Sequence, residues 1–236
     1  MSYIEGFVAA VPTANRDAFA AHAGRASPLF RSFGASRVVD AWGDDVPDGK
    51  INDFKGAVQA RGDETVCFGW MEYPDKATRD AASARMMSDP RMREIGDMPF
   101  DGKRMIFGGF EPIVDAGSAS NAPTYVDGFI VPVPHGNRDA YKALATRAAE
   151  VFLDHGATRV VEAWGDDVPA GKVTDYRRAA HAKDDEAVVF AFIEWPDKAT
   201  RDSGMQATMT DPRMKDAPSD MPFDGRRMVY GGFRQI

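Results

Sequence analysis

The chain has 236 residues, of which 44% are hydrophobic and 28% charged, as in ordinary globular proteins with enough apolar side chains for a core. Its net charge of -7 disfavours non-specific binding to nucleic acid. A single cysteine, Cys67, excludes an internal disulfide framework and fits a reducing compartment. No apolar run approaches the roughly 20 residues that span a bilayer. No basic stretch leads into an apolar signal segment either, so we expect a cytoplasmic protein.

The sequence contains the same unit twice, at an offset of 122 residues over most of its length. About half of the aligned positions are identical, which indicates duplication of a unit of about 110 residues. We expect a first repeat over 1–114, a small polar linker over 115–124 and a second repeat over 125–236. The matching segments are Tyr3–Phe7 with Tyr125–Phe129, Arg37–Lys50 with Arg159–Lys172, Pro74–Asp80 with Pro196–Asp202, and Met98–Phe110 with Met221–Phe233.

The elements of the first repeat can be predicted in chain order. Residues 3–11 alternate as in a strand. A helix is expected from Asn15, its N-cap, to Gly34, and Pro28 is expected to kink or interrupt it. The following elements are expected to be strands over 37–42, 53–60 and 65–73, a helix over 76–87 capped by Asp75, a short helix starting at Asp89-Pro90, and a last strand over 104–110 after the Asp101-Gly102 turn. This order, β-α-β-β-α-β, is typical of a ferredoxin-like unit.

The strand over 65–73 is apolar on both of its faces. Helices of its own repeat can cover one face, so the sheet of the other repeat is the nearest candidate to cover the second. Such packing would close a barrel with the helices outside and would leave no free strand edges. The two apolar faces are formed by Val66, Phe68 and Trp70 on one side and by Cys67, Met71 and Tyr73 on the other.

Several segments closely resemble the YbaA-like family, small bacterial proteins labelled as a domain of unknown function. These segments are YIEGFVAAVP, WGDDVPDGK, EYPDKATRDA, MMSDPRM and MPFDGKRMIFGGFE, and the resemblance covers both copies apart from the linker. It implies the dimeric α/β-barrel superfamily, which includes cofactor-independent monooxygenases, EthD-like proteins and haem-using chlorite dismutases. Typical members have one unit per chain and pair as homodimers. This chain fuses two units, so we expect an α+β fold in which two ferredoxin-like repeats form an intramolecular dimeric α/β barrel.

Four carboxylates are catalytic candidates because they stand among apolar strand residues. They are Glu5 and Asp127 in the first strand of each repeat, and Glu72 and Glu194 at the end of the third. Burial disfavours an ionised carboxylate, which raises its pKa and can poise it as a general acid or base. The alternative is that each acid forms structural ion pairs with arginines found in both repeats, Arg37 and Arg159 or Arg104 and Arg227.

The segment Trp42–Pro47 is repeated unchanged as Trp164–Pro169 and is expected to form a loop. A retained loop favours function, and adjacent aspartates beside a lysine and a tryptophan can bind a polar small molecule or a hard cation. The alternative is a turn in which the aspartates bond their own backbone and the tryptophan packs on a helix. The ligand-binding candidates are Trp42, Asp44, Asp45, Lys50, Trp164, Asp166, Asp167 and Lys172.

No histidine occupies matching positions in both repeats, which excludes a histidine site shared by the two halves. No cluster has zinc-like spacing and haem has no shared axial ligand, so we expect neither a metal nor a bound cofactor. Cys67 is interpreted as a buried inert thiol and the histidines as surface residues. The histidines are His22, His135, His155 and His181.

Three functions follow from these patterns. The first is a pocket between sheet and helices that binds or converts a small organic molecule without a cofactor, with one of the candidate acids as base. The second is a non-catalytic structural or interaction module, which the absence of shared histidine, cysteine or cofactor motifs favours. The third, RNA association, needs a basic groove that the acidic composition disfavours. No membrane partner is expected, and the two repeats are expected to pair with each other.

Overall fold

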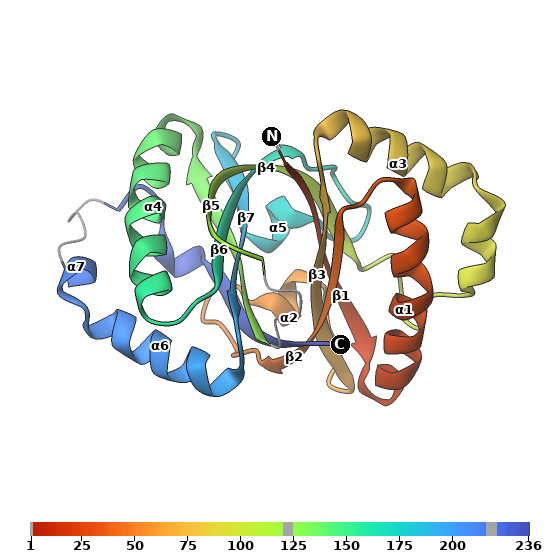
Figure 1. Cartoon of the computed structure of the whole chain (residues 1–236), viewed down its shortest axis with the longest axis horizontal. Coiled ribbons are helices and arrows are strands. Elements are labelled where there is room, and N and C mark those ends of the chain that lie inside the picture. The colour runs from red at the N-terminus through yellow and green to blue at the C-terminus, as the bar shows by residue number, and fades with distance from the viewer. Residues whose placement is uncertain (1, 120–124, 216–220) are drawn as a thin grey trace.

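The computed structural model describes residues 2–119, 125–215 and 221–236. Each repeat folds in the expected order, with one additional short helix between its second and third strands (Figure 1). The first repeat consists of β1 (Tyr3–Pro12), α1 (Arg16–Phe33), β2 (Arg37–Asp45), α2 (Phe54–Ala57), β3 (Glu64–Tyr73), α3 (Lys76–Ser88) and β4 (Ile106–Gly117). The second consists of β5 (Tyr125–Pro134), α4 (Arg138–Asp154), β6 (Arg159–Asp167), α5 (Tyr176–Ala179), β7 (Glu186–Trp195), α6 (Lys198–Thr210), α7 (Pro212–Lys215) and β8 (Val229–Gln235). Short 3-10 helices lie at η1 (Thr13–Asn15), η2 (Pro90–Ile95), η3 (His135–Asn137) and η4 (Gly225–Arg227).

In the described part of the chain, the strands form one closed antiparallel barrel in the order β1-β3-β2-β8-β5-β7-β6-β4. Each repeat contributes four adjacent strands, and the repeats join where β2 pairs with β8 and β4 pairs with β6. Helices α1 and α3 cover one side of the barrel, and α4 and α6 cover the opposite side (Figure 1). The predicted ferredoxin-like repeats and their closed intramolecular barrel are therefore confirmed. No helix among these residues is both long and apolar enough to cross a membrane.

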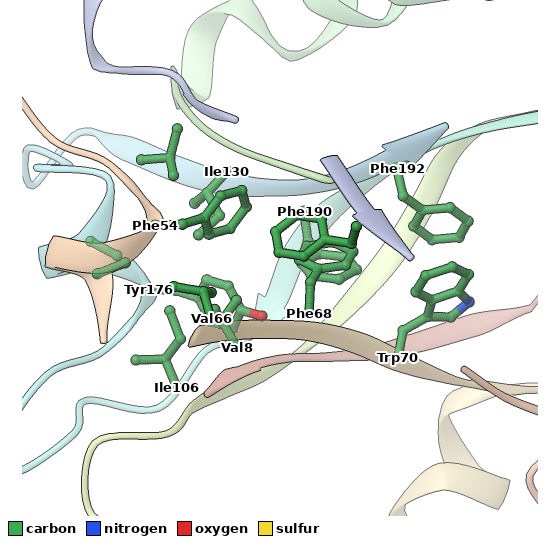
Figure 2. Close-up of a cluster of buried hydrophobic side chains, with 14 of the residues drawn as sticks. Val8, Phe54, Val66, Phe68, Trp70, Ile106, Ile130, Tyr176, Phe190 and Phe192 are labelled. Carbon is green, nitrogen blue, oxygen red and sulfur yellow. The ribbon is translucent and has the colours of Figure 1, made fainter. Parts of the chain in front are cut away.

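The two apolar faces of β3 are buried as expected, one inside the barrel and one beneath the helices. Phe68 and Trp70 point into the barrel, where Phe68 stacks on Phe190 of the other repeat at 4.8 Å and Trp70 stacks on Phe192 at 3.9 Å. Figure 2 shows Phe68 and Phe190 in the middle of the core, and Trp70 and Phe192 at one side of it. On the opposite face of β3, Cys67 is fully buried and burial raises the pKa of its thiol. Side chains of both repeats thus form one continuous core.

Residues 53–60 do not form the expected strand but contain α2. The Asp53 carboxylate accepts a hydrogen bond from the Gly56 amide at 2.6 Å, which caps this short helix. Phe54 and Ala57, three residues apart, lie on one helix face and enter the barrel core. Helices α2 and α5 together close one end of the barrel. Their residues Phe54 and Tyr176 lie at one side of the core, and Trp70 lies at the other side (Figure 2). Residues 54–57 are helical because the barrel buries Phe54 and Ala57, and the local sequence alone does not predict this burial.

Helix α1 continues through Pro28, so of the expected kink or interruption the interruption does not occur. Pro28 is exposed, so the carbonyl of Gly24 that loses its helical donor can bond water. Asn15 stands at the N-cap position, but its side chain bonds the Pro99 carbonyl at 2.8 Å instead of capping α1. Gly34 ends the helix with a positive φ of 123°, a conformation that glycine adopts at little cost.

Strand β4 begins and ends later than expected. Arg104, predicted to start it, is held in the preceding turn by two hydrogen bonds to Glu64 at 2.7 and 2.6 Å. At its other end β4 runs to Gly117 and pairs with β6, so residues 115–117 of the expected linker belong to the barrel. Residues 120–124 of that linker lie outside the described residues.

Candidate functional site

Two of the four acid candidates, Glu72 and Glu194, meet two arginines where the barrel core ends. Arg37 donates to both carboxylate oxygens of Glu194 at 2.6 and 2.7 Å, and Arg159 donates to both oxygens of Glu72 at 2.8 and 3.2 Å. Each pair crosses from one repeat to the other, and Asp115 accepts two further bonds from Arg159. This arrangement corresponds to the ion-pair alternative with Arg37 and Arg159.

The charges of this cluster keep Glu72 ionised. Burial alone would raise the pKa of Glu72, but the hydrogen bonds and charge of Arg159 outweigh it and hold that pKa below its usual value. The Trp70 indole also donates to this carboxylate at 3.0 Å. A carboxylate whose oxygens are already engaged by two arginines and an indole is poorly placed to accept a substrate proton.

The repeated Trp-Gly-Asp-Asp segment ends strands β2 and β6 rather than forming a loop, and its aspartates bind the other repeat. Tyr3 donates its hydroxyl to Asp166 at 2.9 Å, and Arg79 donates to Asp167 at 2.5 Å. Gly109 makes the first contact possible, because a Cβ there would lie 2.4 Å from the Tyr3 hydroxyl oxygen. The two mirror contacts are Tyr125 to Asp44 at 3.1 Å and Arg201 to Asp45 at 2.9 Å. Arg234, whose counterpart is Glu111, adds a further bond to Asp44 at 2.8 Å.

The other ligand-binding candidates do not join these aspartates in a pocket. Trp42 packs in an apolar cluster with Phe19, at 6.1 Å between ring centroids. Trp164 is likewise buried, beside the guanidinium of Arg138. Lys50 and Lys172 are exposed, and neither has an ion pair within the described ranges. The repeated segments therefore account for contacts between repeats, and the structure does not assemble the eight candidates into one site.

Glu5 and Asp127 occupy the helix-facing side of the sheet, and each pairs with an arginine of the helix after its repeat's third strand, α3 or α6. Arg201 holds Asp127 tightly, at 2.7 Å, and the Trp195 indole donates to the same carboxylate at 2.8 Å. Arg79 approaches Glu5 only to 3.4 Å, and Oε2 of Glu5 is buried without a hydrogen bond. Burial raises the pKa of both acids, and the arginines oppose it. Glu5 is the less satisfied of the two.

A cavity of about 280 Å³ lies beside Glu5, between α1 and the outer face of the first repeat's sheet. Two further polar side chains reach it, Asp40 from β2 and His22 from α1. Gly69 stands between Phe7 and Asp40 in the sheet register, and the Phe7 ring lies against it, where a Cβ would come within 2.5 Å. The remaining lining is apolar and consists of Phe7, Phe19, Ala23, Ala26, Phe30, Val38, Met71, Met86, Met98, Phe100, Met105 and Phe107.

Asp40 is the most unusual group in this cavity. Burial raises the pKa of its carboxyl from 3.8 to about 6, and within the described ranges no hydrogen bond or ion pair reaches the carboxylate. Burial, together with the nearby charge of Arg25, lowers the pKa of His22, so its ring is neutral at pH 7, with a buried Nδ1 that lacks a partner. An apolar cavity with three incompletely satisfied polar groups is the usual form of a small-molecule site.

Sequence reasoning included Glu5 in this site but missed Asp40 and His22. His22, interpreted as a surface residue, lines the cavity instead. Asp40 has an acidic counterpart, Glu162, on the same helix-facing side of the second repeat's sheet. The sequence did offer one signal for Asp40. Both repeats retain an acid at this position, on a face of the sheet that a helix was expected to cover.

The comparisons with known proteins place this fold in a family. The sequence matches the family described as "Protein of unknown function (DUF1428)" over residues 2–102 and 124–225. The chain belongs to the DUF1428 family. The "Uncharacterized protein YbaA" of Escherichia coli strain K12 is 59% identical over 116 residues, which are 49% of this chain and 99% of that protein. The same values hold for the YbaA protein of Shigella flexneri, so these DUF1428 relatives are one repeat long.

Solved structures share the fold of this DUF1428 chain at low identity. A protein named "putative monooxygenase" from Lactobacillus acidophilus NCFM has a TM-score of 0.58 and 10% identity, covering 99% of this chain and 93% of that one. A second protein of that name, from Fusobacterium nucleatum, has a TM-score of 0.60 and 10% identity, with 99% and 92% covered. At this identity the likeness shows a common barrel fold.

The raised pKa of the half-buried Asp40 carboxyl has a predicted effect on stability. Because the native carboxyl binds its proton more tightly than the unfolded one, stability falls as the pH rises from about 4 to about 6 and stays reduced above that range. Asp40→Asn should therefore be more stable than the parent by about 1–3 kcal/mol at pH 7.5, and by about half as much at pH 5. Urea unfolding at the two pH values measures this difference.

Other titrating groups near Asp40 need to be separated from this effect. Glu5 from β1, His22 from α1 and Cys67 from β3 face the same region, whereas α3 and the segment before β4 contribute only methionine and phenylalanine. The exposed Asp63 provides the control, since a substitution at the surface, Asp63→Asn, should change stability by less than about 0.5 kcal/mol. An Asp40→Asn variant that is less stable than the parent at pH 7.5 would show that the charge has a stabilising partner.

Proposed function

We propose that the chain binds a small, largely apolar organic molecule in the cavity of the first repeat and holds it through Asp40. The observation that carries this proposal is a carboxylate without a protein partner in an otherwise apolar cavity of about 280 Å³. Asp40 is half-buried, its carboxylate accepts no hydrogen bond from the described residues, and burial raises its pKa, so a ligand that donates to it gains a charge-assisted hydrogen bond. The name of the two solved structures agrees with small-molecule chemistry, but the proposal rests on the cavity.

The cavity limits the size of the ligand. A cavity of about 150 Å³ accommodates one benzene ring, so a cavity of about 280 Å³ fits a two-ring compound. Phenylalanine and methionine side chains dominate its lining and suit a flat aromatic body. Three polar groups at most would then orient the ligand, which is the usual proportion in such sites.

The polar groups also define what chemistry the cavity can support. With a pKa of about 6, Asp40 is mostly ionised at neutral pH and can accept a proton from a ligand hydroxyl or an acidic C–H group. His22, neutral at pH 7, can donate or accept a second hydrogen bond. Glu5 is engaged by Arg79 and is the less available acid. The base is thus Asp40, on β2, rather than the acids proposed from the sequence.

Calorimetric titration with naphthalene and 2-naphthol tests this function. We expect one molecule to bind per chain, and a ligand excess of 100-fold over Kd should raise the unfolding midpoint by roughly 5–10 °C. Ala23→Leu, which adds a side chain into the cavity from α1, should abolish binding. Ala148→Leu makes the same change on α4 of the second repeat, where the alanine is equally half-buried, and should leave binding intact.

Two results would contradict the proposal. One is the absence of heat and of any shift in midpoint with either compound at its solubility limit. The other is equal loss of binding in Ala23→Leu and Ala148→Leu, which would place the ligand outside the first-repeat cavity.

A further inference from the structure

The second repeat has a different pair of side chains at the positions of Phe19 and Asp40. At an offset of 122, Tyr141 replaces Phe19 and Glu162 replaces Asp40. Tyr141 donates its hydroxyl to Oε2 of Glu162 at 2.7 Å, and of the two residues Tyr141 is buried and Glu162 is half-buried. Burial would raise the pKa of this carboxyl further, but the hydrogen bond from the phenol opposes it and leaves it at about 7. A half-buried carboxylate of this fold is therefore satisfied by a phenol.

The two rings occupy equivalent positions in their repeats. Phe19 meets Phe100 edge-on at 5.8 Å, and Tyr141 meets Phe223, the counterpart of Phe100, edge-on at 5.5 Å. The first repeat keeps the ring but lacks its hydroxyl, and Asp40 is one methylene shorter than glutamate. The first difference removes the hydroxyl that donates the hydrogen bond in the second repeat. The second difference draws the carboxylate back toward the sheet by one methylene. The carboxylate of Asp40 then has no protein donor, and a cavity lies in front of it.

Two other differences between the repeats also affect the first-repeat cavity. His22 stands where the second repeat has Leu144, which places a ring nitrogen in the cavity. Gly69 stands where the second repeat has Ala191, and only a glycine allows the Phe7 ring to lie against the sheet there. Each of these four substitutions alters the lining of one cavity, and together they replace an internal hydrogen bond by an empty space with polar groups.

We infer that the first-repeat cavity takes an aromatic ligand with a phenol-type hydroxyl, which donates to Asp40 as Tyr141 donates to Glu162. This inference rests on the proposed binding function and names its ligand class. The hydroxyl supplies the donor that Phe19 lacks, and the aromatic body fills the phenylalanine- and methionine-lined space. A ligand carboxylate would instead be repelled by Asp40 and Glu5.

Three naphthalene compounds test the hydroxyl on the unmodified protein. A hydrogen bond to a charged acceptor predicts that 2-naphthol binds about 10- to 100-fold more tightly than 2-methoxynaphthalene or naphthalene, measured by calorimetry at pH 8. Equal affinities would overturn the phenol inference and the role of Asp40 in holding the ligand, while binding in the cavity stands. Absence of binding by all three would overturn both. Tighter binding of the cation 1-naphthylmethylammonium would show that the site recognises positive charge, which also overturns the inference.

The double variant Phe19→Tyr/Asp40→Glu rebuilds the second repeat's pair inside the first. We expect it to fold, to be at least as stable as the parent, and to lose at least 10-fold in 2-naphthol affinity, because its own phenol satisfies the carboxylate. Glu162→Gln is the matched control in the second repeat and should leave that affinity unchanged. Unchanged 2-naphthol binding in a folded double variant would overturn the inference. If the double variant does not fold, Asp40→Asn decides, since it must reduce the preference for 2-naphthol over 2-methoxynaphthalene.

Discussion

Replacing Arg159 by methionine is expected to lower the free energy of unfolding by about 3–5 kcal/mol. Arg159 is 5% exposed and donates to both Glu72 and Asp115, so its removal leaves three buried or half-buried carboxylates, including Glu194, with Arg37 as the only arginine of the cluster. Removing one partner of a buried pair costs more than the pair contributes, because the remaining charge stays desolvated. Urea unfolding monitored by tryptophan fluorescence measures the loss.

The pH dependence of this variant has a definite sign. Without Arg159 the pKa of Glu72 should rise, so the native state would bind protons more tightly than the unfolded state, and the variant's stability should fall as the pH increases above 5. Arg234→Met is the control, because Arg234 is half exposed and pairs with Asp44 at the surface, where solvent screens the ion pair and its contribution to stability is small. A loss in Arg159→Met no larger than in this control would contradict the assignment of a structural ion-pair cluster.

Replacing Phe68 by alanine is expected to destabilise the protein by about 3–5 kcal/mol. Phe68 is fully buried and stacks on Phe190 at 4.8 Å and on Phe233 at 5.2 Å, both from the second repeat. Its ring also lies against Gly128, where a Cβ would come within 2.7 Å. The alanine variant therefore leaves a void at the centre of contacts that join the repeats. Thermal and urea unfolding should show one cooperative transition at a lower midpoint.

Tyr230 provides an aromatic control for this prediction. It lies on the outer side of β8 and is 50% exposed, so Tyr230→Ala should cost less than about 1 kcal/mol. If Phe68→Ala separated the unfolding into two transitions, or cost no more than Tyr230→Ala, the two repeats would not share the single core described above.

The fold could be predicted from the sequence because its strongest signals can be read directly from the residues. The offset of 122 residues identifies two equivalent units, and strand 65–73, apolar on both faces, requires cover from helices and from a second sheet. Helix α2 was not accessible in this way. Four residues carry no helical periodicity, and Phe54 and Ala57 are helical because the open end of the barrel buries them.

The site was less accessible for a related reason. The twice-retained Trp-Gly-Asp-Asp segment suggested a ligand loop, whereas its aspartates bind Tyr3 and Tyr125 across the repeats. Asp40 looks in the sequence like any acid on the outer side of a strand. Only the packing of α1 over the sheet shows that this carboxylate is half-buried beside an apolar cavity and has no protein partner among the described residues. The cavity is therefore indicated by positions at which the two repeats differ, more than by positions at which they are identical.

A crystal structure of the protein grown with saturating 2-naphthol tests the central claim most directly. We predict one naphthol between α1 and the sheet of the first repeat, with its oxygen about 2.5–3.0 Å from a carboxylate oxygen of Asp40. Naphthol bound only elsewhere, or seated in the cavity with its hydroxyl turned away from Asp40, would contradict the claim.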